Sequence, residues 1–223
     1  MKNYSLSRGL LLVASVAATA LLSVQTTHAG TTVYTSRTLF LAALSGPSYT
    51  EDFNSLTNNT TVVSGTTFSG NGFAYTVVAT GDLFVETING SQALDAKSGS
   101  TPVTFTFTGA PVTAFGGNFF IDNTVNLVNG TVTLAANDGT TFPSAVSGTG
   151  PEPFIGFITD AATPFVSVTL SGVRSNATSG FVGSDNVTTG NSTVLAPEPA
   201  SVALLLAGLA PLVGMVRARR RSS

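Results

Sequence analysis

The chain of 223 residues contains no cysteine and no tryptophan, and its single histidine is His28. Between Gly30 and Ala196 there is therefore neither histidine nor cysteine. This absence excludes a Ser-His-Asp triad, a Cys-His pair, a zinc or haem bound through these residues, and a disulfide framework for that stretch. No glycine-rich phosphate loop is present either. An enzyme built on this stretch would have to use paired carboxylates, as glycoside hydrolases do.

Basic side chains are also scarce. The stretch from Gly30 to Ala196 has three of them, Arg37, Lys97 and Arg174, against ten acidic side chains, which gives a net charge of −7. Such a charge repels nucleic-acid phosphates and anionic membranes, so neither is expected as a partner of this stretch. Most of the acidic side chains are expected on a solvated surface, where catalytic use is the less favoured interpretation.

Without tryptophan, sugar stacking would fall to tyrosines. Tyr34, Tyr49 and Tyr75 are available, although packing in or at the rim of a core is the expected use of such side chains.

The N-terminal segment has the order of an export signal. Lys2 and Arg8 precede an apolar run from Gly9 to Val24, and Thr27-His28-Ala29 is a small-residue cleavage site before Gly30. Residues 1–29 are therefore predicted to be a signal peptide that is removed on export.

The C-terminal segment has three parts. Pro197-Glu198-Pro199 is followed by an apolar run from Val202 to Val216 and then by four arginines, at positions 217, 219, 220 and 221. With its flanks the run covers about 17 residues, or roughly 25 Å as a helix, close to the shortest length that crosses a membrane. Arg217, Arg219, Arg220 and Arg221 would stay on the cytoplasmic side and fix the orientation of a transmembrane helix.

This order of parts resembles the PEP-CTERM sorting signal of Gram-negative bacteria, which is recognised by membrane proteases called exosortases. The tripeptide follows Ala196, where the commonest form of the signal has valine. The resemblance implies an exosortase-type protease as partner, with Pro197, Glu198, Pro199 and the arginines as sorting residues. A plain single-span anchor is the alternative. A second copy, Pro151-Glu152-Pro153, precedes no arginine cluster and is interpreted as an extended turn.

Between the two ends the pattern is that of β-strands. Val103–Thr108 alternates apolar and polar residues with a period of two, and Phe73–Val77 and Phe165–Leu170 do so less regularly. Many short segments of this kind predict an all-β fold, an antiparallel β-sandwich of jelly-roll type. The residues expected in its core are Phe105, Phe107, Val166, Val168 and Leu170.

Local signals place turns and one helix. Asn89-Gly90 and Asp138-Gly139 predict turns, and Asn129-Gly130 predicts a two-residue hairpin between Thr124–Val128 and Thr131–Ala135. Ser144–Gly150 is expected to be a surface loop. Ser36 is positioned to cap a short helix over Thr38–Leu44 that ends before Gly46-Pro47.

Three segments resemble, more weakly, the β-sandwich domain common in PEP-CTERM proteins: Glu51-Asp52-Phe53, Pro111–Gly116 and Phe181–Val187. In jelly rolls the first and last strands commonly lie close together, which would bring Asp52 near Asp185 and Asn186. These three residues are then candidate oxygen ligands for calcium, the one cofactor that the pattern suggests. In the alternative interpretation, Asp185-Asn186 bonds neighbouring backbone at the start of a strand, and Asp52 caps a turn.

The chain is thus expected to comprise a signal peptide (1–29), a β-sandwich domain (30–190), a linker (191–196) and a sorting signal (197–223). The resemblance implies an exported, non-catalytic protein of the cell surface or extracellular matrix, with extracellular polysaccharide as a further candidate partner. The alternative is a carbohydrate-active protein on the same fold, either a binding module or a carboxylate hydrolase. A groove with two carboxylates about 5–10 Å apart beside exposed tyrosines would favour that alternative.

Overall fold

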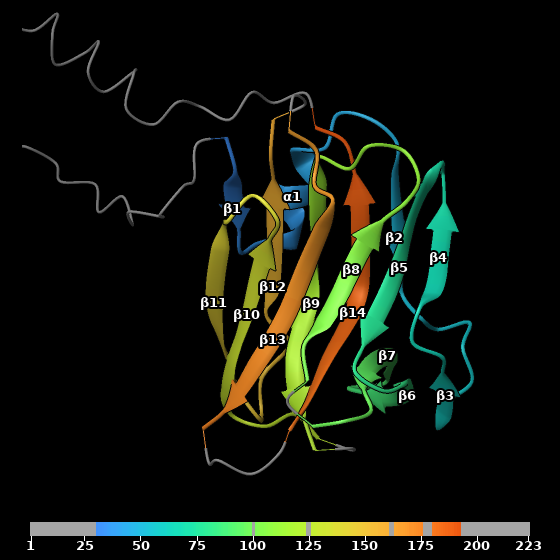
Figure 1. Cartoon of the computed structure of the whole chain (residues 1–223). Coiled ribbons are helices and arrows are strands. Elements are labelled where there is room, and N and C mark those ends of the chain that lie inside the picture. Colours follow the sequence, from blue (N-terminus) through green and yellow to red (C-terminus); the bar gives the residue numbers. More distant parts are fainter. Residues whose placement is uncertain (1–29, 100, 124–125, 161–162, 176–179, 193–223) are drawn as a thin grey trace, which may run out of the picture.

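The computed structural model describes residues 30–99, 101–123, 126–160, 163–175 and 180–192. Within them, two antiparallel sheets pack face to face into a β-sandwich, as predicted (Figure 1). The front sheet in Figure 1 runs in the order β11-β10-β13-β8-β5-β4. Its strands are β4 (Thr66–Gly70), β5 (Phe73–Ala79), β8 (Val103–Phe107), β10 (Gly130–Ala136), β11 (Thr141–Val146) and β13 (Ser167–Arg174).

The rear sheet runs in the order β1-β12-β9-β14-β7-β6-β3, and β2 also pairs with β14. Its strands are β1 (Thr32–Tyr34), β2 (Ser48–Glu51), β3 (Thr60–Val62), β6 (Leu83–Ile88), β7 (Ser91–Ala96), β9 (Ala114–Asp122), β12 (Phe154–Ile158) and β14 (Phe181–Gly190). β14 is shared along its length: Val187–Gly190 pair with β2, while Gly183 and Ser184 pair with β7.

The core fills the space between the sheets with aromatic and β-branched side chains. Phe105 of β8 packs against Phe115 and Phe119 of β9, with ring centroids 5.1 and 6.4 Å apart. Phe105, Val168 and Leu170 are fully buried, as the alternation predicted, and Phe107 packs against the core from its edge.

The prediction for Val166 is wrong, because its side chain is 62% exposed. β13 begins only at Ser167, and the side-chain oxygen of Asn137 accepts hydrogen bonds from the backbone N–H groups of both Val166 and Ser167. This bend breaks the alternation just before the strand, so that Phe165 instead of Val166 is buried.

The short helix is confirmed as α1 (Arg37–Ala42). The Ser36 hydroxyl accepts a hydrogen bond from the backbone N–H of Leu39 at 3.4 Å, which is the capping role predicted for it. Phe40 is fully buried in a small second cluster with Phe154 and Ile158. The helix therefore covers the part of the rear sheet nearest β1 and β12.

Two of the three predicted turns are confirmed. Asn89 and Gly90 both have positive φ, at 50° and 87°, and join β6 to β7. Gly139, with φ of 91°, lies in the turn between β10 and β11.

The hairpin predicted at Asn129-Gly130 is wrong. Gly130 is the first residue of β10, pairs with Val146 and Arg174, and has no positive φ. Glycine is needed there for close packing, since a Cβ would lie 2.6 Å from the Val173 carbonyl oxygen. The predicted loop at Ser144–Gly150 also begins later than expected, because β11 continues to Val146.

The end of the sandwich reaches into the predicted linker. Ser192 is buried, its backbone N–H donates to the Thr113 hydroxyl at 2.8 Å, and its own hydroxyl donates to the Ala43 carbonyl at 2.8 Å. No helix in the described part of the chain is long and apolar enough to cross a membrane. The predicted signal peptide, the apolar run Val202–Val216 and the sorting residues Pro197, Glu198, Pro199, Arg217, Arg219, Arg220 and Arg221 lie outside the described residues.

Candidate metal centre

Three acidic side chains are buried together at one end of the rear sheet. Glu86, Asp95 and Asp122 are 3%, 1% and 0% exposed, and each offers a carboxylate oxygen within 4.8 Å of the others. They come from β6, β7 and β9 respectively. The expectation that acidic side chains lie on a solvated surface is therefore wrong for these three.

The side chains lie on the face of the rear sheet that is turned away from the front sheet. On β9, Phe119 contacts Phe105 of the front sheet, and a Cβ on Gly172 of the front sheet would lie 3.0 Å from Ile121. Because side chains alternate along a strand, Phe120 and Asp122 point to the opposite face. Asp95 is paired with Gly183 of β14, which in turn is paired with Phe120, so these residues form one row across the sheet.

Strong curling of the sheet brings the acidic side chains within reach of one another. β6 and β9 are separated by β7 and β14, which in a flat sheet would place them about 14 Å apart. In Figure 1, β9 and β14 extend from the top to the bottom of the picture, whereas β6 and β7 are foreshortened because they run toward or away from the viewer. Their carboxylates can therefore meet above β14.

Gly183 of β14 has no side chain, which leaves room for the Asp95 carboxylate beside the other two acids. A Cβ at this position would lie 1.8 Å from Oδ1 of Asp95 and 2.3 Å from the ring of Phe120. The glycine thus permits the Asp95 carboxylate to lie directly over the backbone of β14.

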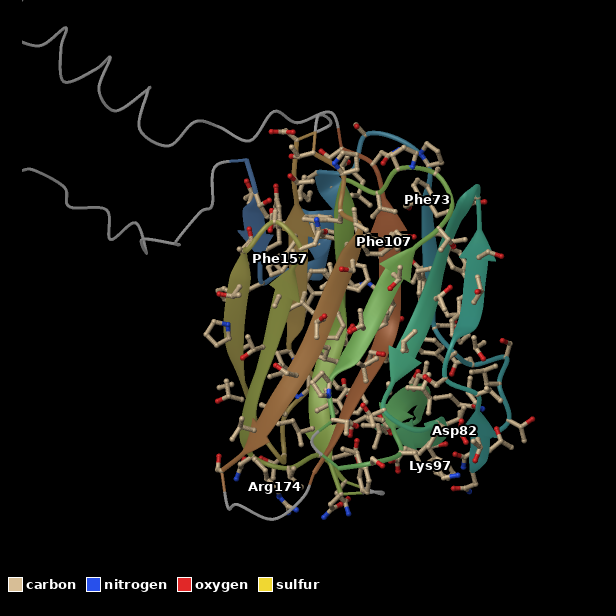
Figure 2. The ribbon with its side chains drawn as sticks, in the orientation of Figure 1. Phe73, Asp82, Lys97, Phe107, Phe157 and Arg174 are labelled. Carbon is tan, nitrogen blue, oxygen red and sulfur yellow. The ribbon has the colours of Figure 1, made fainter. Side chains whose placement is uncertain are left out.

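A pocket of about 200 Å³ opens next to these acids, lined by Phe84, Glu86, Asp95, Ala96, Lys97 and Phe181. Its walls are mostly apolar, while Glu86 and Asp95 supply negative charge. Lys97 lies at the lower end of the sandwich in Figure 2, and its Nζ donates a hydrogen bond to the Thr61 hydroxyl at 3.0 Å.

The carboxylate of Asp95 lacks the donors that a buried charge requires. Among the residues that the structure describes, no group donates a hydrogen bond to either of its oxygens, and none donates to Oε2 of Glu86. Burial raises the pKa of Asp95 well above its ordinary value, and the negative charge of Asp122 and contact with Glu86 raise it further. The contact with Glu86 can be a hydrogen bond only when one of the two groups carries a proton.

Of the three predicted calcium ligands, Asp185 and Asn186 lie in β14 itself, and Asp52 directly follows β2. β2 pairs with β14, and in this pairing Glu51 lies opposite Val187. Asp52 is the next residue after Glu51, so the segment that contains it lies close to β14, as predicted. Burial raises the pKa of Asp185, the hydrogen bonds from Ser91 and from the Asn186 N–H oppose this increase, and the charges of Glu152 and Asp52 add smaller increases. The carboxylates nevertheless bond their own neighbours: Asp52 accepts from the Asn54 N–H at 3.1 Å, and Asp185 accepts from the N–H and side-chain amide of Asn186 at 2.5 and 2.9 Å.

These hydrogen bonds agree with the alternative interpretation of the sequence in that both aspartates bond nearby backbone, although Asp185 lies inside β14 and not at the start of a strand. Asn186 has φ of 53° and lies in the irregularity of β14 between Asp185 and Thr188. Calcium binding by Asp52, Asp185 and Asn186 stays a prediction.

The tyrosines are used for packing. Tyr75 is fully buried, Tyr49 packs against the main core, and Tyr34 packs against Phe40 of the second cluster with ring centroids 5.9 Å apart. None of the three lines the acidic pocket, whose aromatic residues are Phe84 and Phe181.

Comparisons of the chain with protein-family models, with curated proteins and with solved structures find no match.

Proposed function

We propose that this protein is an exported, non-catalytic protein of the cell surface or extracellular matrix, sorted through a C-terminal signal of PEP-CTERM type. The observation that carries the proposal is the succession of Pro197-Glu198-Pro199, an apolar run and four arginines. The prolines hold the tripeptide extended and keep it out of the following helix, as a protease substrate requires. The arginines hold the apolar run in the membrane with the tripeptide on the non-cytoplasmic side.

In this proposal the precursor is held in the membrane by its C-terminal helix and is recognised by an exosortase-type protease. Glu198 is a recognition contact. The β-sandwich is the part that is delivered to the cell surface or to the extracellular polysaccharide. Support for export also comes from the charged and then apolar N-terminal segment.

We further propose that the sandwich is of jelly-roll type. The support is its long-range pairing: β14 lies between β9 and β7, and β13 lies between β10 and β8. In both sheets the central strands are thus neighbours that are distant in the sequence, which is typical of Greek-key connections.

The carbohydrate-active alternative has one supporting observation, the pocket with carboxylates beside Phe84 and Phe181. Oxygens of Glu86 and Asp95 lie within 4.8 Å of each other and both side chains are buried. Hydrolytic pairs stand on either side of a substrate bond with the separation of about 5–10 Å expected above. Of the two forms of this alternative, a binding module therefore fits better than a hydrolase.

The proposal is tested by replacing Pro197-Glu198-Pro199 with three alanines in the native host and determining both termini by mass spectrometry. The expected result is an uncleaved, membrane-retained form that is heavier than the mature protein by the sorting segment. The internal Pro151-Glu152-Pro153 provides a matched control, since its replacement should leave processing unchanged. Equal processing and equal membrane fractions for the wild type and the Pro197-Glu198-Pro199 variant would overturn the proposal in favour of a plain anchor.

A further inference from the structure

We propose that Glu86, Asp95 and Asp122 form a calcium site at the end of the sandwich where β6 and β7 curl over β14. This site is distinct from Asp52, Asp185 and Asn186, and it does not depend on the sorting signal.

The geometry of the three carboxylates fits one shared cation. Two oxygens bound to the same calcium ion at about 2.4 Å each can be no more than about 4.8 Å apart. The ligand atoms of the three side chains all lie within 4.8 Å of one another. The residues come from three different strands, so the arrangement is a product of the fold and not of one local turn.

Asp95 provides an independent indication that something binds there. Its side chain is 99% buried, points toward the other two acids, and receives no hydrogen bond from the described residues. A buried carboxylate without donors is costly unless a cation or a proton neutralises it. Gly183 reinforces this indication, because any side chain there would occupy the position of Asp95 Oδ1.

The donor set favours calcium over other divalent ions. Three carboxylates offer up to six oxygens, and calcium takes six to eight oxygen ligands in flexible geometry, whereas magnesium usually keeps several waters and uses one or two carboxylates. Nitrogen and sulfur ligands, which zinc and copper prefer, are absent from the cluster. The adjacent pocket of about 200 Å³ gives room for water molecules to complete the coordination.

Calcium bound here would link β6 and β7 to β9. Among the described strands, β14 is the one that pairs with both β7 and β9, and it pairs with β7 at just two positions, Gly183–Asp95 and Ser184–Leu94. The cation would therefore stabilise the curled end of the sheet, and its binding should raise the melting temperature of the whole sandwich.

The test uses the full-length chain purified in detergent, with calcium, magnesium or the chelator EGTA as the only variable. Wild-type protein should bind calcium in equilibrium dialysis, and saturating calcium should raise Tm by about 5 °C or more over EGTA. The near-isosteric Asp95→Asn should lower calcium affinity at least tenfold and remove the rise in Tm. Glu86→Gln should have the same effect, which provides a second test should Asp95→Asn fail to fold.

Asp185→Asn is the matched control, because it removes an acidic side chain of the same strand system that lies outside the cluster. It should keep the full calcium response. Identical melting curves for wild-type protein in calcium and in EGTA would overturn the proposal. So would a response that is lost in Asp185→Asn and kept in Asp95→Asn, since that result would place the ion at Asp52 and Asp185.

Discussion

The strand β9 buries two different kinds of side chain on its two faces. Toward the front sheet it presents Phe115, Phe119 and Ile121, which pack against other apolar groups. On the opposite face it ends in Asp122, which meets the carboxylates of Glu86 and Asp95. The stabilisation by apolar burial does not depend on pH or on bound cations, whereas the buried acids depend on the proton or cation that neutralises them. One strand thus joins a region that is insensitive to pH and calcium to a region that should respond to both.

The largest expected effect belongs to the apolar region. Phe105→Ala should lower the free energy of unfolding by about 3–5 kcal/mol, because it removes a fully buried ring that packs between the two sheets. Urea denaturation should show the same loss in calcium and in EGTA.

Val166→Ala is the control for this change. The side chain is 62% exposed, so its truncation should alter the free energy of unfolding by no more than about 0.5 kcal/mol. A negligible effect of Phe105→Ala on the free energy of unfolding would contradict the placement of this ring in the core. An effect that depends on calcium would show that the apolar region and the acidic region are not separate.

These two positions also show how far the sequence predicts the fold. Alternation with threonine was sufficient to place Phe105, Val168 and Leu170 in the core, since the face of a regular strand follows from its period. It failed at Val166, where Asn137 binds the backbone just before the strand begins. The hairpin prediction at Asn129-Gly130 was also wrong, because a glycine can be required for close packing, as Gly130 is in β10, as well as for a turn.

The acidic cluster could not be predicted from the sequence. Glu86, Asp95 and Asp122 show no ligand spacing along the chain, and they stand on three different strands. Their meeting depends on the curl of β6 and β7 over β14, which is a property of the sheet and not of any one segment. The pairing of β2 with β14, by contrast, agrees with the expected closeness of Glu51-Asp52-Phe53 to Phe181–Val187, although the first strand is β1, which pairs with β12.

An intermediate effect is expected at the boundary between the regions. Gly183→Ala would place a methyl group on the Asp95 carboxylate and the Phe120 ring, and should lower the free energy of unfolding by about 1–3 kcal/mol. Calcium affinity should fall as well, because Asp95 must move. Gly46→Ala serves as the control, since no atom lies within 4 Å of a Cβ there. Unchanged stability and calcium binding in Gly183→Ala would mean that Asp95 does not lie over this glycine.

The smallest expected effect concerns alkaline pH. Burial raises the pKa of Tyr75 well above its ordinary value, and burial together with the hydrogen bond to Glu51 raises that of Tyr49. Both stay protonated in the folded state where the unfolded chain ionises, so their contribution to stability should be constant below about pH 10 and fall above it. The fall should be up to about 1.4 kcal/mol per pH unit for the buried Tyr75, and less for Tyr49, which is partly exposed to solvent. Urea midpoints between pH 8 and pH 11 measure the fall.

Tyr75→Phe should reduce this slope. Stability below pH 10 should not decrease in this variant, because the Tyr75 hydroxyl has no hydrogen-bond partner among the described residues. A slope equal to that of the wild type would show that the Tyr75 hydroxyl reaches solvent.

The two-sided pairing of β14 has a mechanical consequence. A tension applied beyond Ser192 is transmitted along a strand that is hydrogen-bonded to β9 on one side and to β2 and β7 on the other. A force directed along the axis of β14 loads these ladders in shear, so that many hydrogen bonds must break together. At the opposite end of the chain β1 is paired on one side only, through three residues, and resists far less force. The sandwich should therefore resist a larger force when it is pulled at Ser192 than when it is pulled at β1.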